Sequence, residues 1–181
     1  GYEDRLTVRA IKKSIDGALG SHGAWLLEPY ADLSDSAGLN TTPIETIEET
    51  ARLALEHGFQ LCVHAIGDRA NRETLDLFER AFRATLGAQD LRWRIEHAQI
   101  VDPVDLPKFG QDGIIASMQP VHQTSDRVMA EARLGPDRLA GAYAWNSILK
   151  AGGRLAFGSD APVESPDPFA ALAAATTRMD A

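Results

Sequence analysis

Five polar side chains in this 181-residue sequence occupy similar places in a repeating pattern. Each ends a short apolar run or lies just after one: Lys12, His64, His97, His122 and Asp160. In parallel sheets and barrels, the carboxyl ends of the strands form the edge where ligands bind. Imidazole nitrogens and carboxylate oxygens at such an edge are typical ligands of a divalent metal. Because these residues recur in register with the repeat, the sequence predicts a metal site.

The runs that precede these residues predict five strands, over residues 6–12, 59–64, 91–97, 113–118 and 154–158. Segments with apolar residues at three- and four-residue spacing separate them, most clearly over Ile44–His57 and 71–86, and these predict helices. Gly58 follows the first of these helices, where a stop signal belongs. Strands that alternate with helices indicate an α/β fold with a parallel sheet.

The composition favours a globular chain and argues against nucleic-acid and membrane partners. Hydrophobic residues make up 44% of the sequence, yet no apolar run approaches the length needed to cross a bilayer. The formal net charge is −8, which argues against nucleic acid and anionic membranes as partners. Cys62 is the single cysteine, so no intrachain disulfide can form, and its apolar neighbours favour a buried thiol. We therefore expect a cytoplasmic protein.

Five segments resemble motifs of amidohydrolase family 3, a branch related to N-substituted formamide deformylase. They follow one another in the family's order and cover residues 12–21, 64–71 (HAIGDRAN), 95–99, 117–122 and 157–162 (FGSDAP). The resemblance implies a metal-dependent hydrolase built on a (β/α)8 TIM barrel. The five predicted strands match about strands four to eight. Residues 1–181 are therefore expected to form one partial barrel domain, without strands one to three or the family's small β-sandwich.

The resemblance also implies roles for four of the strand-end residues. His64 and His97 match the histidines that bind the second metal of the family's site. Asp160 matches the aspartate that binds the first metal and exchanges protons with the bridging water, which makes it the expected catalytic residue. His122 matches a residue placed to contact substrate rather than metal.

Lys12 is open to several interpretations. By its four-residue spacing from Asp16 it matches a family lysine that is carboxylated and bridges two metals. Lys13 is a weaker match, since its side chain would point to the opposite face of the strand. A strand-end lysine can also act without metal, as the nucleophile of a Schiff-base aldolase or lyase. Equally, Lys12 could be a solvated residue of an edge strand.

The leading hypothesis is a hydrolase that cleaves a non-peptide amide or another C–N bond. Its complete site would hold one or two divalent metals, with zinc the expected one. A bound divalent ion lowers the pKa of its water to about 7 and polarises the scissile carbonyl. An aspartate beside that water can take the proton and later deliver it to the leaving amine. The substrate itself is not encoded in these motifs, because specificity in barrels lies largely in the loops.

The sequence contains no His-x-His, the motif that ends strand one in this family. Five of eight barrel strands would also leave two sheet edges unpaired. We therefore expect the chain to form a homo-oligomer or otherwise associate through its open edges, or to be part of a longer protein. We also expect it to bind divalent metal weakly or not at all by itself. A third hypothesis is accordingly a catalytically silent fragment that only self-associates.

Overall fold

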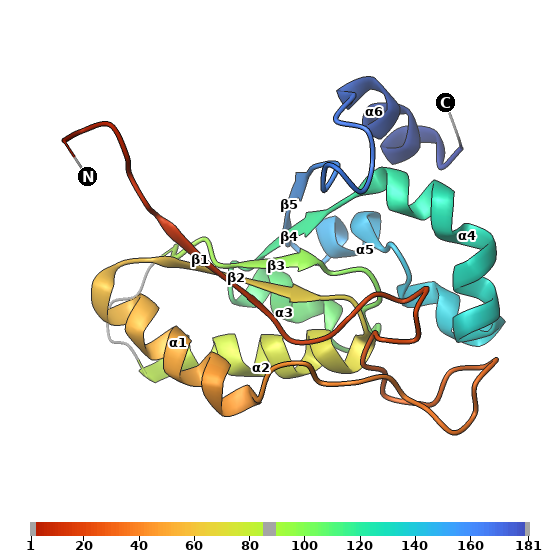
Figure 1. The fold of residues 1–181 in the computed structure, drawn as a ribbon, viewed down its shortest axis with the longest axis horizontal. Coiled ribbons are helices and arrows are strands. Elements are labelled where there is room, and N and C mark those ends of the chain that lie inside the picture. The colour runs from red at the N-terminus through yellow and green to blue at the C-terminus, as the bar shows by residue number, and fades with distance from the viewer. Residues whose placement is uncertain (1–2, 85–89, 180–181) are drawn as a thin grey trace.

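The computed structural model describes residues 3–84 and 90–179. Five strands form one parallel sheet in chain order: β1 (Ala10–Ser14), β2 (Gln60–Ala65), β3 (Arg94–His97), β4 (Ile115–Met118) and β5 (Arg154–Phe157). Between and after them lie α1 (Ile44–His57), α2 (Asp68–Ala84), α3 (Leu106–Gln111), α4 (Pro120–Leu134), the 3-10 helix η1 (Pro136–Gly141), α5 (Trp145–Lys150) and α6 (Pro168–Thr177). The predicted α/β fold, five parallel strands alternating with helices, is confirmed (Figure 1).

The first strand differs from its prediction. β1 lies at Ala10–Ser14 and not at residues 6–12, so Lys12 is a mid-strand residue opposite Cys62. The strand ends at Ser14, which lies opposite His64. Apolar residues before position 10 suggested an earlier start, but a strand extends only where a neighbouring strand pairs with it. The prediction that Lys12 ends its strand is therefore wrong.

The other predicted boundaries hold to within a few residues. α1 matches its prediction and ends before Gly58, whose left-handed backbone (φ 70°) forms the C-cap. α2 begins at Asp68 and not at residue 71, and its predicted end at residues 85–86 lies outside the described residues. β3 and β4 each begin two or three residues later than predicted. Among the described helices, none is both long and apolar enough to cross a membrane.

The two faces of the sheet differ in character. Ile95 and Ala116 point to a buried face, and α1, α2 and α3 lie on one side of the sheet (Figure 1). Arg94, Glu96 and Ser117 alternate with these residues and stay partly exposed on the other face. Within the described part of the chain, β1 and β5 each pair on one side only. The sheet therefore has an open polar face and two free edges.

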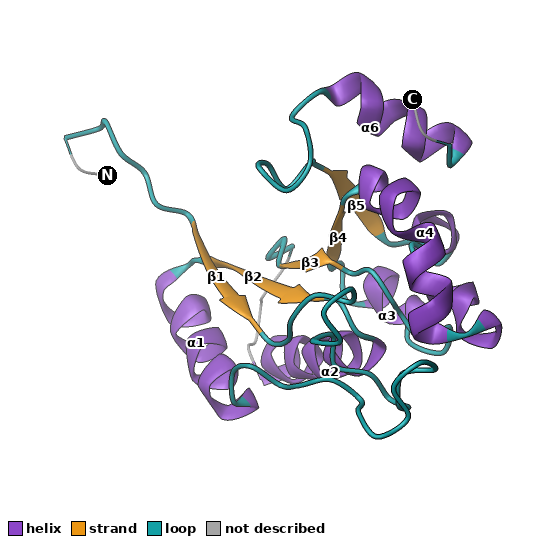
Figure 2. Ribbon diagram, turned by 45° about the vertical axis from the view of Figure 1, so that its right-hand side comes forward, coloured by secondary structure: helices purple, strands orange, loops and turns teal. Residues whose placement is uncertain are grey.

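The loop over residues 17–42 packs against the turn between β2 and α2 (Figure 2). Gly67 lies in this turn, and a Cβ added there would be 2.0 Å from the carbonyl oxygen of Trp25. Only glycine allows so close an approach. Ala70 donates its backbone N–H to the same carbonyl at 3.2 Å, and the Arg69 guanidinium lies 5.0 Å from the centre of the Trp25 ring. The loop is thus fixed to the end of β2.

Asn71 binds this turn to the segment that follows β3. Its side chain is fully buried. The Asn71 Nδ2 group donates to the carbonyl oxygens of Gly67 at 2.9 Å and Ile100 at 3.0 Å. A buried carbonyl that loses its partner costs free energy that the fold must supply elsewhere.

Replacing Asn71 by leucine should lower the free energy of unfolding by about 1–3 kcal/mol, because buried carbonyls lose their donor. Urea denaturation measures the change. Asn146→Leu is the control, since Asn146 is exposed on α5 and a surface substitution of this kind changes stability by less than about 0.5 kcal/mol. Equal effects of the two substitutions would contradict the role given to Asn71.

Candidate metal centre

Three imidazole rings converge at the carboxyl ends of β2, β3 and β4. The ring centres of His64 and His97 are 4.5 Å apart, with an edge-to-face angle of 73°. His122, in the first turn of α4, stacks against His97 at 6.0 Å and 17°. The predicted positions of these three histidines therefore bring their side chains to one edge of the sheet, where ligands bind in folds of this type.

The backbone at the end of β3 redirects His97. Simple alternation would place its side chain on the same face as Ile95, toward the helices. His97 (φ 75°) and Ala98 (φ 43°) instead adopt the left-handed conformation, which ends the pleat. Asp160 also has a positive φ, of 54°. Non-glycine residues in this conformation are uncommon and cluster at functional sites.

His97 is held as a neutral base. Burial and the neighbouring His64 ring lower the pKa of His97 to about 4. Its Nδ1 atom lies 2.8 Å from the side-chain oxygen of Gln119. Since that oxygen can only accept, Nδ1 carries the ring proton and Nε2 keeps its lone pair. Neutral imidazole with a free lone pair is the form that binds metal.

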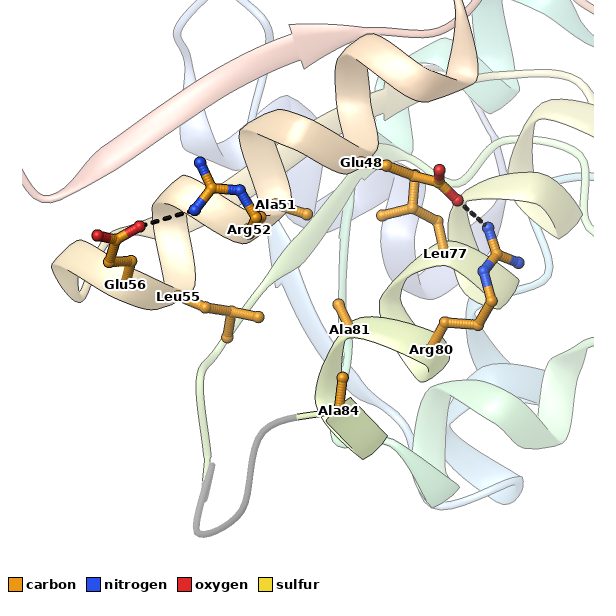
Figure 3. A pocket seen from close by; sticks show the side chains of 9 residues that line it. All are labelled: Glu48, Ala51, Arg52, Leu55, Glu56, Leu77, Arg80, Ala81 and Ala84. Atoms are coloured by element: carbon orange, nitrogen blue, oxygen red, sulfur yellow. Dashed lines mark hydrogen bonds and ion pairs between the residues drawn. The ribbon is translucent and has the colours of Figure 1, made fainter.

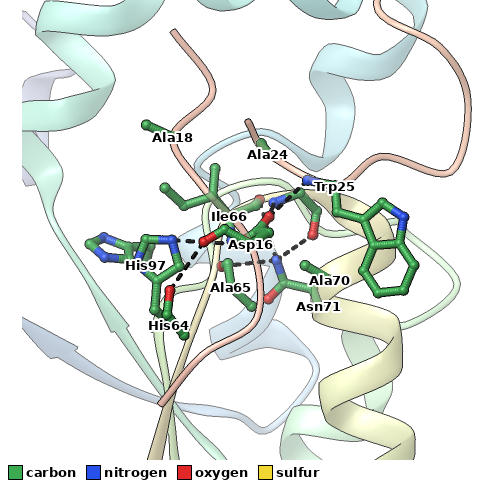
Figure 4. A network of polar contacts seen from close by, with 12 residues as sticks. Asp16, Ala18, Ala24, Trp25, His64, Ala65, Ile66, Ala70, Asn71 and His97 are labelled. Atoms are coloured by element: carbon green, nitrogen blue, oxygen red, sulfur yellow. Dashed lines mark hydrogen bonds and ion pairs between the residues drawn. The ribbon is translucent and has the colours of Figure 1, made fainter. Parts of the chain in front are cut away.

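His64 has a carboxylate partner on the other side of the site (Figure 4). Its Nε2 atom lies 3.4 Å from Oδ1 of Asp16, a close electrostatic contact rather than a well-formed hydrogen bond. The Asp16 side chain is fully buried, whereas 18% of the His64 side chain is exposed. A histidine ligand whose second nitrogen faces a carboxylate is a recurrent arrangement in metal sites.

The two remaining candidate ligands stand apart from this pair. Asp160 is exposed, although its charge is close enough to oppose the lowering of the His97 pKa. Lys12 is exposed on β1. It lies two residues before Ser14, the residue that pairs with His64. Within the described residues, no three His, Cys, Asp or Glu side chains are grouped closely enough to hold a metal ion. His64 and His97 thus fit two ligands of a divalent metal but not a complete set.

Two polar residues of this edge were given no role by the sequence. Asp16 served only as a marker for the spacing of Lys12, and Gln119 was part of the resemblance over residues 117–122. Both lie against a histidine nitrogen. Their position inside motifs that also carry candidate ligands could have indicated a role for both residues, since polar residues near a ligand often orient it.

A groove of about 490 Å³ lies elsewhere, on the outer surface between α1 and α2 (Figure 3). Its apolar lining includes Leu55 and Leu77. Its charged rim is neutralised by ion pairs, such as that between Arg80 and Glu48. The groove contains none of the strand-end residues, so the candidate site is the histidine cluster and not this groove.

The low pKa of His97 predicts a loss of stability in acid for the metal-free chain. Between the folded value of about 4 and the usual unfolded value of about 6.5, the unfolded chain binds a proton that the folded chain does not. This contribution to stability is fully present above about pH 6.5 and is lost as the pH falls to about 4. It amounts to about 3 kcal/mol.

Urea unfolding in the presence of a chelator, at several pH values from 7 to 4, measures this loss. The loss should shrink in His97→Gln but not in His57→Gln, because His57 is exposed at the end of α1. An unchanged pH dependence in His97→Gln would show that other groups cause it.

Comparison with known proteins gives consistent matches. The model of the amidohydrolase family matches residues 1–181. The chain is 37% identical over 175 residues to Protein LONG AFTER FAR-RED 3 of Arabidopsis thaliana, which covers 96% of this chain and 30% of that protein. It is 36% identical over 169 residues to Putative amidohydrolase YtcJ of Bacillus subtilis (strain 168), covering 93% of this chain and 31% of that protein.

A solved structure agrees with these sequence matches. The crystal structure of an uncharacterized metal-dependent hydrolase from Pyrococcus horikoshii OT3 matches with a TM-score of 0.86 and 31% identity, covering 96% of this chain and 34% of that one. The chain thus spans about a third of the length of the proteins it matches. On the family match over its whole length, the chain belongs to the amidohydrolase family.

Proposed function

We propose that this chain supplies part of the active site of a metal-dependent hydrolase that cleaves a non-peptide amide or another C–N bond of a small molecule. The observation that carries the proposal is the pair His64 and His97, whose rings lie 4.5 Å apart at the carboxyl edge of a parallel sheet. The names of two relatives, a putative amidohydrolase and a metal-dependent hydrolase, support it. Zinc and a cytoplasmic location are further parts of the proposal.

In this proposal the strand-end residues have separate roles. His64 and His97 offer neutral nitrogens to the metal. When bound, a divalent ion would lower the pKa of water to about 7 and polarise the scissile carbonyl. Asp160 holds the proton of the attacking water on its carboxylate and returns it to the leaving amine. His122, which stacks on His97, contacts the substrate beside the reacting bond.

The geometry favours this chemistry over a Schiff base formed by Lys12. A nucleophilic lysine must lose its proton near neutral pH, which requires burial or a neighbouring cation. Lys12 is exposed in the middle of β1. Carboxylation of Lys12 in the complete site stays part of the metal proposal, because Lys12 shares a sheet face with His64.

Asp160→Asn in the full-length protein should lower kcat by about 10²–10⁴-fold, because the amide cannot take the proton from water. Hydrolysis of a panel of N-acyl and N-formyl amines, with zinc present, measures this. Glu164→Gln removes a charge from the same loop and should leave kcat nearly unchanged. A near-normal kcat in Asp160→Asn would mean that another residue moves the proton.

The chain of residues 1–181 should retain far less than one equivalent of divalent metal after dialysis. Two neutral imidazoles provide no negative charge, and Asp160 is exposed, whereas zinc needs three or four ligands in fixed geometry. Elemental analysis measures the metal, and intact-mass spectrometry detects a carboxyl group added to Lys12. Stoichiometric zinc or a carboxylated Lys12 would show that these residues alone build a competent site.

A further inference from the structure

We propose that Asp16 is a positioning residue that fixes His64 in the tautomer with the proton on Nε2, and that it joins this ring to the loop over residues 17–42. The inference rests on the proposed metal role of His64. Its test, however, observes the proton on the ring directly and needs neither metal nor substrate.

The carboxylate of Asp16 is fully buried. It accepts hydrogen bonds from three backbone N–H groups. Its Oδ2 atom accepts the backbone N–H groups of Trp25 at 2.9 Å and Gly67 at 2.8 Å. Its Oδ1 atom accepts the N–H of Ile66 at 3.0 Å and faces Nε2 of His64 at 3.4 Å. Three donors from two distant segments hold the carboxylate in place, so its oxygen toward His64 has a fixed position (Figure 4).

This fixed oxygen determines which nitrogen of His64 carries the proton. A neutral imidazole has one N–H and one lone pair. The Nε2 atom is buried and forms no well-aligned hydrogen bond within the described residues, and the oxygen of Asp16 is close to it. A proton on Nε2 is attracted to that oxygen, whereas a lone pair there would be repelled. The proton therefore resides on Nε2, and Nδ1 is left free to bind.

Gln119 has the opposite effect on His97. Its side-chain oxygen accepts from Nδ1 of His97, so that ring offers Nε2. The two imidazoles of the pair thus present different nitrogens, each selected by one buried acceptor. Loss of a group that orients a histidine ligand in this way typically lowers metal affinity or activity about 10–100-fold.

The same carboxylate couples the ring to the loop. Asp16 accepts the N–H of Trp25, a residue of the segment that covers the turn after β2. Asp68 accepts the N–H of Leu27 at 2.8 Å and that of Arg69 at 2.9 Å. Asp16 and Asp68 therefore hold the same loop on the same turn, but of these two aspartates only Asp16 has an imidazole contact among those found for the described residues. Asp68 is the matched control.

The test is ¹⁵N NMR of histidine-labelled chain at about pH 9, where an ordinary imidazole carries one proton. Wild type should show the proton of His64 on Nε2. In Asp16→Asn the amide oxygen can accept from Gly67 and Trp25, which leaves the NH₂ group facing His64 and the N–H of Ile66. The opposite orientation would set the NH₂ group against two backbone N–H groups, so the first is favoured. The NH₂ group then donates to Nε2, so the ring proton should move to Nδ1. In Asp68→Asn it should stay on Nε2.

A wild-type His64 protonated on Nδ1 would overturn the inference, and so would an Asp16→Asn variant that keeps the proton on Nε2. If that variant does not fold, the wild-type spectrum alone decides. In the full-length protein, zinc affinity should fall about 10–100-fold in Asp16→Asn and stay unchanged in Asp68→Asn. A moved proton with unchanged affinity would support the inference and count against the proposed metal role of His64.

Discussion

The turn that follows β2 brings buried backbone groups to the carboxyl edge of the sheet, and buried groups of this kind need partners. Asp16 accepts the N–H groups of Ile66 and Gly67, and Asn71 donates to the carbonyl of Gly67. Because Asp16 also binds the loop and Asn71 also binds Ile100, the same contacts hold three segments together. The position of His64 follows from this turn, since His64 lies at the end of the strand that leads into it.

The left-handed backbone at His97 is the second requirement of the site. The pleat of β3 would direct this ring toward the helices, and two residues with positive φ bring it beside His64 instead. Burial there keeps the ring neutral. A neutral ring next to another imidazole avoids the repulsion that two cations would suffer at this distance. Geometry and protonation state therefore have a common cause, which is the way β3 ends.

The sequence predicted the strand order, the alternation with helices and the strand-end positions of His64 and His97, because apolar periodicity and chemical type are local properties. It misplaced Lys12, because the register of β1 depends on its pairing with β2. It gave no role to Asp16 or Gln119, because an acceptor becomes important only once folding buries it beside a donor. No periodicity in the sequence indicates that His97 would leave the pleat.

The contacts of Asp16 also constrain the order in which this edge can assemble. Its partners Ile66 and Gly67 lie 50 and 51 residues further along the chain, whereas Trp25 is only nine residues away. Closing the longer segment costs more chain entropy and brings no reward until β1 and β2 pair. The loop can therefore approach Asp16 early, but the three donors and the imidazole come together only after the two strands have aligned. The contacts of Asp16 at this edge therefore depend on the pairing of β1 with β2.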